Sequence, residues 1–440
     1  MKLYIFLLLL LFSCKEPNII TVPTIPVEQN YIVSEIHYET IDVCRAIDVS
    51  EGVLLAAASS NGYMRFNIIN NSNGEVSLEL ATHIPDIDTQ VGDDAAYNVL
   101  ISNNISDYDN LKEMYFILDD VDNIFREDLN DGALGDLGNC GNSLLYRDMA
   151  LNNDIPDTTL LFTLQKHFDV LPDGFDFYST SVGVREFYNT TVSIDEDAYG
   201  YDILDTLFES NGCNALINPN IESMKVFYAD NFLTVAEGGL GVDIYRYDRD
   251  ISEPFTDTNG NGSYDQAGCY GYPSEQYFLF ETQEACESGG FEWILEAEEF
   301  EDTIVADGIY TAFKDSLEFK DNFYIQGGDA SSLFSKGNLV IGGFDNDRGC
   351  YMALLDSDGG IMGNLSFADG YSIRAIDYDN GFLVLAAGND GVLVYQWDET
   401  LSINFLTIID SGDDNYVYDV KIYEDNIYTA SENGISIYKI

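Results

Sequence analysis

The stretches FLVLAAGNDGVLVYQW (Phe382–Trp397) and NIYTASENGISIYKI (Asn426–Ile440) follow one pattern. Each has an apolar strand, small residues, an Asn or Asp before a Gly, and then an alternating strand. Asn-Gly and Asp-Gly tolerate the positive φ that two-residue hairpin turns require. The alternation predicts one packed face and one outward face. The pattern therefore predicts a tight β-hairpin that occurs at least twice.

The hairpin pattern recurs along the rest of the chain. Two copies are clear, at Val53–Ile68 and Phe232–Tyr247. Three weaker copies are Phe175–Tyr188, Asn338–Leu355 and Glu113–Asp128. Small residues stand ahead of most of the turns, which indicates strands that crowd towards a common axis.

The spacing of the turn glycines indicates the architecture. The steps from Gly349 to Gly391 and from Gly391 to Gly434 are 42 and 43 residues. Repeats of about 40–50 residues with four short strands are typical of β-propeller blades. We expect an all-β fold of seven four-stranded blades, with turns near Gly62, Asp122, Gly183, Gly241, Gly349, Gly391 and Gly434. Asp307–Phe319 resembles a further turn and third strand, so eight blades are the alternative.

The two ends of the chain are predicted to close the ring. The last residues, GISIYKI, form the third strand of their blade. Apolar and polar residues alternate along Tyr31–Glu39. This segment resembles the expected fourth strands at Glu75–His83 and Thr400–Ile408. If this N-terminal strand joins the last blade, the ring has no open sheet edge.

The tetrapeptide Arg-Ala-Ile-Asp occurs at Arg45 and again at Arg374. Both copies fall on the first strand of a blade, the first and the one before last. The Ala and the Ile of each copy should lie on opposite faces of that strand. Asp48 and Asp377 would then either face the axial channel or satisfy backbone donors in a turn.

These motifs resemble the LVIVD-repeat propellers, which are exported bacterial proteins. Tyr418–Ile440 is the best match, and the copies at Val53 and Phe382 are nearly as good. The segment from Gly92 to Thr191 departs most from the family pattern. The resemblance implies a propeller at the cell surface or in the periplasm, and it implies no established chemistry.

The first residues, MKLYIFLLLLLFSC, indicate export. The apolar run is shorter than the roughly 20 residues that a membrane-spanning helix needs, and it has the length of a signal-peptide core. LFSC resembles a bacterial lipobox, so we expect a lipoprotein signal peptide at 1–13, lipidation of Cys14, a tether at 14–30 and the propeller at 31–440. An ordinary secretory signal is the alternative. Lys15 after the lipidated residue favours the outer membrane.

The net charge is extreme. The chain has 77 acidic and 19 basic residues, for a formal charge of −58. Such a surface repels nucleic acid, which is bound through Lys and Arg. It attracts divalent cations, and it also suits a saline habitat without any ligand.

The repeat fails between about residues 251 and 301. The stretch DTNGNGSYD there resembles the first nine positions of an EF-hand-type loop, with Gly268 where a Glu should complete the shell. The candidate calcium ligands are Asp257, Asn259, Asn261, Ser263 and Asp265, completed by Glu275 or Glu281. A solvated turn is the alternative. We expect a disulfide between Cys269 and Cys286 to staple this insert, with Trp293 covering it.

Two functional hypotheses remain. His37, His83 and His167 have no metal-ligand spacing, and no nucleophile or phosphate-loop motif is present. The first hypothesis is a non-catalytic envelope lipoprotein that binds a protein or a glycan. The second is a calcium-dependent propeller enzyme, a glycan lyase or lactonase-like hydrolase, with a carboxylate-lined central channel.

Overall fold

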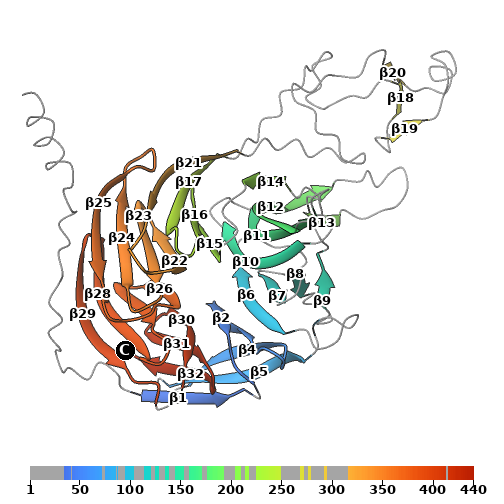
Figure 1. Ribbon diagram of the computed structural model, residues 1–440. Helices are drawn as coiled ribbons and strands as arrows, with labels where there is room; N and C mark the ends of the chain where they lie inside the picture. The colour runs from blue at the N-terminus through green and yellow to red at the C-terminus, as the bar shows by residue number, and fades with distance from the viewer. Residues whose placement is uncertain are drawn as a thin grey trace, which may run out of the picture.

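In the computed structural model the chain forms a ring of seven β-sheet blades around a central channel (Figure 1). The structure describes residues 34–40, 42–71, 75–85, 87, 95–103, 113–119, 124–127, 134–137, 144–152, 158–170, 176–192, 204–209, 214–217, 224–248, 268–271, 276–278, 292–294, 316–412 and 415–440. None of these residues belongs to a helix long and apolar enough to cross a membrane.

The first three blades come from the N-terminal half of the chain. The first contains β2 (Ala46–Ser50), β3 (Val53–Ala57), β4 (Tyr63–Asn70) and β5 (Val76–Ile84). The second contains β6 (Ala96–Ser102), β7 (Met114–Asp119), β8 (Ile124–Glu127) and β9 (Leu134–Asp136). The third contains β10 (Leu144–Asn152), β11 (Thr158–Val170), β12 (Asp176–Val192), β13 (Leu204–Glu209) and β14 (Asn214–Ile217).

The remaining four blades complete the circle. The fourth contains β15 (Lys225–Ala229), β16 (Phe232–Ala236), β17 (Val242–Asp248) and β21 (Ser316–Phe323). The fifth contains β22 (Ala330–Lys336), β23 (Leu339–Phe344), β24 (Gly349–Leu355) and β25 (Ile361–Phe367). The sixth contains β26 (Ala375–Asp379), β27 (Phe382–Ala386), β28 (Val392–Thr400) and β29 (Ser402–Ile409). The seventh contains β30 (Val417–Tyr423), β31 (Asn426–Ser431), β32 (Gly434–Lys439) and β1 (Ser34–Glu39).

Each blade is an antiparallel sheet, and its strands follow one another outward from the axis in chain order, except that β1 is the outermost strand of the seventh blade. In the third blade β13 and β14 share the fourth place, because they pair with different parts of β12. The all-β prediction of seven four-stranded blades is confirmed. The segment that suggested an eighth blade was misread, since its described residues begin β21, the fourth strand of the fourth blade.

The predicted closure of the ring is also confirmed. Strand β1 pairs antiparallel with β32, from Ser34 opposite Lys439 to Glu39 opposite Gly434. The segments that β1 resembles in sequence are β5 and β29, which likewise are fourth strands. Three strands from the C-terminus and one from the N-terminal side therefore build a single blade.

The core is divided into seven clusters of apolar side chains, one between each pair of neighbouring blades. Strand β27 shows how this arises. Its Leu383 and Leu385 pack on the fifth blade, whereas Val384 and Ala386 pack on the seventh. The third strand β28, for which the alternation predicted an outward face, is packed on both sides in the same way, with Leu393 and Tyr395 on the fifth blade and Val392 and Val394 on the seventh. That prediction was therefore wrong, because blades stacked face to face bury both sides of the strand.

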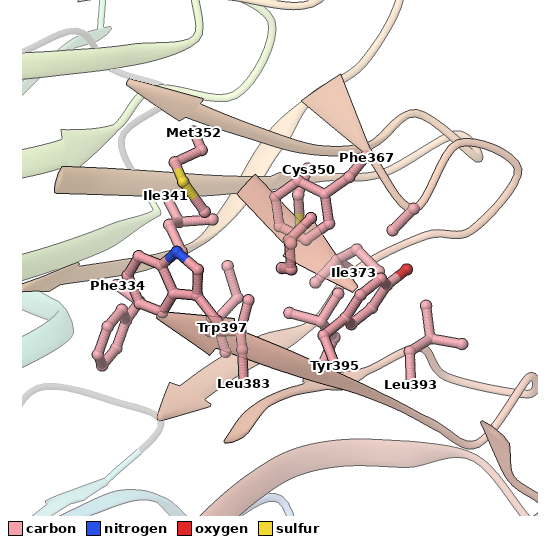
Figure 2. Close-up of a cluster of buried hydrophobic side chains, with 14 of the residues drawn as sticks. Phe334, Ile341, Cys350, Met352, Phe367, Ile373, Leu383, Leu393, Tyr395 and Trp397 are labelled. Atoms are coloured by element: carbon pink, nitrogen blue, oxygen red, sulfur yellow. The ribbon is translucent and has the colours of Figure 1, made fainter. Parts of the chain in front are cut away.

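Figure 2 shows the cluster between the fifth and sixth blades, where Trp397 lies near Phe334 and Ile341. Trp397 is 1% exposed, and its indole N–H donates to the carbonyl of Thr400 at 2.8 Å. The cluster also holds Cys350. Cys44 is buried between the seventh and first blades, and both thiols are free. Burial raises the pKa of each thiol well above its ordinary value.

The hairpins between second and third strands are present, but most do not have the predicted two-residue turn. In the first, fourth and sixth blades the turn takes five residues, 58–62, 237–241 and 387–391, with the same three backbone hydrogen bonds. In the seventh blade, Glu432 and Asn433 form a two-residue turn. The two-residue turn with positive φ instead joins the first strand of a blade to the second. An example is Asn380 and Gly381, which have φ of 50° and 86°.

The repeated glycine serves a close approach as well as a turn. Gly391 has φ of 78°, and a Cβ there would lie closer than 3.0 Å to the carbonyl of Ile409 in the fourth strand. A Cβ would lie equally close to the backbone of the fourth strand of the same blade at four other glycines, which are Gly62, Gly241, Gly349 and Gly434. Only glycine combines this φ with the absence of a side chain.

The third blade is where the turn prediction was wrong. Gly183 lies inside β12, opposite Thr163 of β11, and not in a turn. These two strands are 13 and 17 residues long, so their connection falls at 171–175. A Cβ at Gly183 would clash with the side chains of Thr163 and Gln165, so this glycine serves cross-strand packing. The predicted turn at Asp122 lies outside the described residues, between β7 and β8.

Candidate functional site

The channel holds a cavity of about 690 Å³. Its lining comes from the inner strands of all seven blades, which are β2, β6, β10, β15, β22, β26 and β30. A cavity of several hundred Å³ is the size at which proteins bind small molecules or the projecting end of a partner. The channel is therefore the first place to search for function.

Four inner strands carry a β-bulge near the point where they begin. In β6 the pairing steps from Ala96 opposite Asp119 to Asn98 opposite Leu118, which leaves Tyr97 without a partner in the ladder. The same step occurs in β10, β22 and β30. The extra residue at a bulge is re-aimed relative to the strand. The four bulged residues are Tyr97, Arg147, Ser331 and Tyr418, and all four line the cavity.

The other three blades contribute the residue directly before the inner strand. These residues are Arg45, Met224 and Arg374, and they also line the cavity. Seven residues, one from each blade, thus surround one end of the channel. We call this set the mouth ring, and it consists of Arg45, Tyr97, Arg147, Met224, Ser331, Arg374 and Tyr418.

Contacts with neighbouring loops fix the side of the molecule on which the mouth ring lies. Arg45 donates to the hydroxyl of Ser59 at 3.4 Å, and Arg374 pairs with Asp345 at 2.8 Å. Both partners belong to turns between second and third strands. The mouth ring therefore opens on the face that carries these turns.

Part of the mouth ring is ordered by stacking between cations and aromatic rings. The guanidinium of Arg45 lies 5.8 Å from the ring centre of Tyr418, which lies 4.7 Å from that of Tyr416. Arg374 lies 5.6 Å from the Tyr416 ring on the next blade. Cation–π contacts of this length contribute about 0.5–1 kcal/mol each at exposed sites. They hold the arginine heads in place without neutralising them.

Farther along the inner strands, carboxylates in four of the seven blades tie the blade to the next one. Asp48 accepts a hydrogen bond from the backbone N–H of Ile101 at 2.8 Å, and Asp377 accepts one from Ile422 at 2.7 Å. Both aspartates therefore satisfy backbone donors, as one sequence interpretation expected, but the donors belong to the neighbouring blade and not to a turn. Asp48 lines the cavity as well, so the two interpretations of this residue are compatible.

The same link recurs in two other blades. Asp148 accepts from the backbone N–H of Val226 at 2.9 Å in the following blade. Asp419 accepts from Ile47 at 3.0 Å, which joins the seventh blade to the first. These bonds lie beside the axis, where the strands of all blades approach each other most closely.

Two lysines compensate the buried negative charge. Lys225 pairs with Asp148 at 3.1 Å, and Lys421 pairs with Asp48 at 3.6 Å. Burial alone would lower the pKa of both lysines, but the neighbouring carboxylates outweigh it and raise the pKa of each. Burial raises the pKa of Asp377 to about 6, against the attraction of Lys421.

Comparison with a solved structure agrees with the propeller fold. The chain is similar to the WD40 repeats of RRP9 in a crystal structure, with a TM-score of 0.50 and 11% identity over 91% of this chain and 96% of that one. It also aligns with the computationally designed Ika8 protein, with a TM-score of 0.43 and 8% identity over 91% and 98% of the two chains. No family model matches the chain, and no curated protein does. The likeness to LVIVD-repeat propellers therefore stays a resemblance of motifs.

Most of the residues predicted for lipid, metal and disulfide sites lie outside the described residues. These are Cys14, Asp257, Asn259, Asn261, Ser263, Asp265 and Cys286. The insert contains a small sheet of β18 (Gly268–Gly271), β19 (Gln276–Phe278) and β20 (Glu292–Ile294), in which Cys269 is the register partner of Trp293. The calcium site, the disulfide and the lipid anchor remain predictions.

His37 and His83 lie on outer strands, β1 and β5, as expected. Their rings contact the hydroxyl of Ser436 at 2.9 Å and the carbonyl of Asn61 at 3.0 Å. Within the described parts of the chain, no three or more His, Cys, Asp or Glu side chains gather in a way that could hold a metal ion.

The mouth ring itself escaped the sequence analysis. Arg45 and Arg374 were identified only as parts of a repeated tetrapeptide, and Arg147 belongs to no motif that the sequence shows. A bulge leaves no distinct mark in one sequence, so Tyr97, Arg147 and Tyr418 could not be assigned to the channel. The available signal was the scarcity of basic residues, because two of the 19 stand at matching places in the repeat.

Proposed function

We propose that this protein is a lipid-anchored, non-catalytic binding module of the bacterial cell envelope, held at the outer membrane. In this proposal the propeller is a rigid platform, and the mouth ring is the surface that holds a protein or glycan partner. The observation that carries the proposal is the mouth ring, since every blade contributes one residue to it.

The binding proposal is preferred to the enzyme alternative because of the contacts of the channel carboxylates. Asp48, Asp148 and Asp419 are each engaged by a backbone N–H of the next blade. Asp48 and Asp148 also pair with a lysine. Carboxylates committed in this way serve assembly of the ring, and they leave few oxygens to coordinate calcium or to transfer protons.

Capture from envelope extracts tests the binding surface. The mature chain is immobilised beside a Tyr97→Ala/Arg147→Ala/Met224→Ala variant and a control, Phe319→Ala/Met362→Ala, which removes exposed apolar side chains from outer strands. We expect a partner that is retained by the wild type and the control and lost by the mouth variant. Equal capture by all three proteins would contradict the proposal.

The anchor and the insert need separate tests. Labelled palmitate should enter the wild type and not a Cys14→Ala variant, and labelling of neither would rule out the lipoprotein.

For calcium, melting of the purified protein should occur at a lower temperature in EDTA, and the Asp257→Asn/Asp265→Asn variant should lose this difference. An unchanged melting temperature with no bound metal would remove calcium from the account.

A further inference from the structure

Positive charge is concentrated in the channel of this very acidic protein. Five of the 19 basic residues line the cavity, but only four of the 77 acidic residues do. The basic residues are Arg45, Arg147, Lys225, Arg374 and Lys421, and the acidic ones are Asp48, Asp148, Asp345 and Asp419. The lining therefore has a small positive formal charge on a chain of −58.

In the described part of the chain, the basic residues of the lining that have no carboxylate partner lie in the mouth ring. Three of the basic residues have a carboxylate partner within the cavity lining, at 3.1, 3.6 and 2.8 Å. Among the residues that the structure describes, neither Arg45 nor Arg147 has an ion pair. Both are exposed. Arg45 is held by Ser59 and by the ring of Tyr418, so its head is positioned but not neutralised. Two guanidinium groups that line a cavity and have no ion pair attract an anion.

The rest of the mouth offers flat apolar surface. Tyr97 is 40% exposed, and Met224 is 55% exposed. Tyrosine rings stack on the faces of sugar or aromatic rings, and methionine adapts to irregular apolar shapes. A ligand that carries its charge on a ring would use both kinds of contact at once.

The overall charge limits the size of that anion. A long polyanion would run over a surface that repels it. A small anion inside the mouth lies within the Debye length of about 8 Å from the arginines at physiological salt. Guanidinium groups form paired, charge-assisted hydrogen bonds with carboxylates, which is a geometry that lysine cannot provide.

From these features we propose that the mouth ring binds small molecules or chain ends that carry a carboxylate on a ring, with Arg147 and Arg45 holding the carboxylate and Tyr97 and Tyr418 contacting the ring. The inference rests on the mouth being the binding surface of the proposed function, and it names the chemistry of the contact. Sugar acids and aromatic acids are the two sources that share this chemistry.

Calorimetric titration of the mature chain distinguishes these sources. The probes are glucuronate and benzoate, each beside its neutral counterpart, glucose and benzamide. We expect at least one acid to bind about tenfold or more tightly than its neutral counterpart, since only the acid forms charge-assisted hydrogen bonds with the arginines. Whichever acid binds identifies the kind of ring.

Variants tie the binding to the mouth. Arg147→Gln and Arg45→Gln should each weaken binding of that acid about tenfold. Arg246→Gln, on β17 and outside the cavity lining, should leave it unchanged. Thermal melting of each variant shows that the ring is intact.

Several outcomes would overturn the inference. They are binding of neither acid, equal binding of acid and neutral counterpart, an unchanged affinity in both arginine variants, and a stronger affinity per residue for polygalacturonate than for glucuronate. If a partner is captured through the mouth while neither acid binds, the proposed function stands and this inference does not.

Discussion

At the scale of single residues, the aspartates beside the axis both build the ring and make it sensitive to pH. The pKa of Asp377 rises from its ordinary value of 3.8 to about 6, chiefly because the side chain is buried. Between these pH values the folded chain binds a proton that the unfolded chain has released. This group therefore lowers the free energy of unfolding as the pH rises from about 4 to 6.

The variant Asp377→Asn tests that statement. The amide oxygen can still accept from the N–H of Ile422, but the group no longer titrates. We expect the free energy of unfolding of the variant, relative to wild type, to rise by about 1–3 kcal/mol between pH 4 and pH 7. Urea unfolding at both pH values measures this, with Asp379→Asn on the same strand as the control for loss of one charge. A pH-independent difference would show that Asp377 is ionised normally.

The turn glycine makes a second prediction at this scale. Gly391 and Gly381 have similar φ, 78° and 86°, but a Cβ at Gly381 would have no neighbour closer than 3.8 Å. We expect Gly381→Ala to cost about 1–2 kcal/mol, which is the cost of positive φ alone. Gly391→Ala should cost about 2 kcal/mol more, because its Cβ meets the fourth strand. Equal losses in urea unfolding would mean that the glycine serves only the turn.

At the scale of elements, β1 determines whether the ring is closed. His37 and Ser436 are register partners on β1 and β32, and their side chains are in contact. Partners in antiparallel strands have the Cα separation that a disulfide needs. A His37→Cys/Ser436→Cys variant should therefore form a bond that fastens the N-terminal strand to the last blade.

That bond should stabilise the protein, because it closes a loop of nearly the whole chain in the unfolded state. We expect a gain of about 2–4 kcal/mol in the oxidised variant, which dithiothreitol removes. Melting of the oxidised and reduced forms provides the comparison. If oxidation has no effect on unfolding, the β1–β32 pairing is not what holds the ring together.

The elements also show how far sequence alone could reach. Alternation and glycine spacing sufficed for the blades with short strands, and the likeness of Tyr31–Glu39 to later outer strands located β1. The same rules misplaced the third blade, because β11 and β12 extend beyond the repeat and enclose Gly183. A hairpin pattern cannot distinguish a glycine in a turn from one that makes room for Thr163 and Gln165.

The site residues that could not be predicted from the sequence are those whose positions depend on bulges or on contacts between blades. Asp48 and Asp377 could be proposed as channel residues because their tetrapeptide repeats. Tyr97 and Arg147 could not, since their orientation depends on one extra residue in an inner strand. The bond from Asp419 to Ile47 joins residues 372 positions apart, and only the closed ring brings them together.

At the scale of the whole molecule, a rigid ring carries a local inversion of charge. Seven apolar clusters hold neighbouring blades together, so the mouth ring is built on strands and not on free loops. The net charge of −58 disfavours polyanions, while Arg45 and Arg147 favour a small anion at one place. The central claim is therefore that the mouth ring is the binding surface.

A crystal structure of the mature chain with glucuronate or benzoate tests this claim most directly. We predict the carboxylate within hydrogen-bonding distance of the guanidinium of Arg147 or Arg45, with its ring against Tyr97 or Tyr418. A ligand bound on the outer strands, with an empty mouth, would contradict the account.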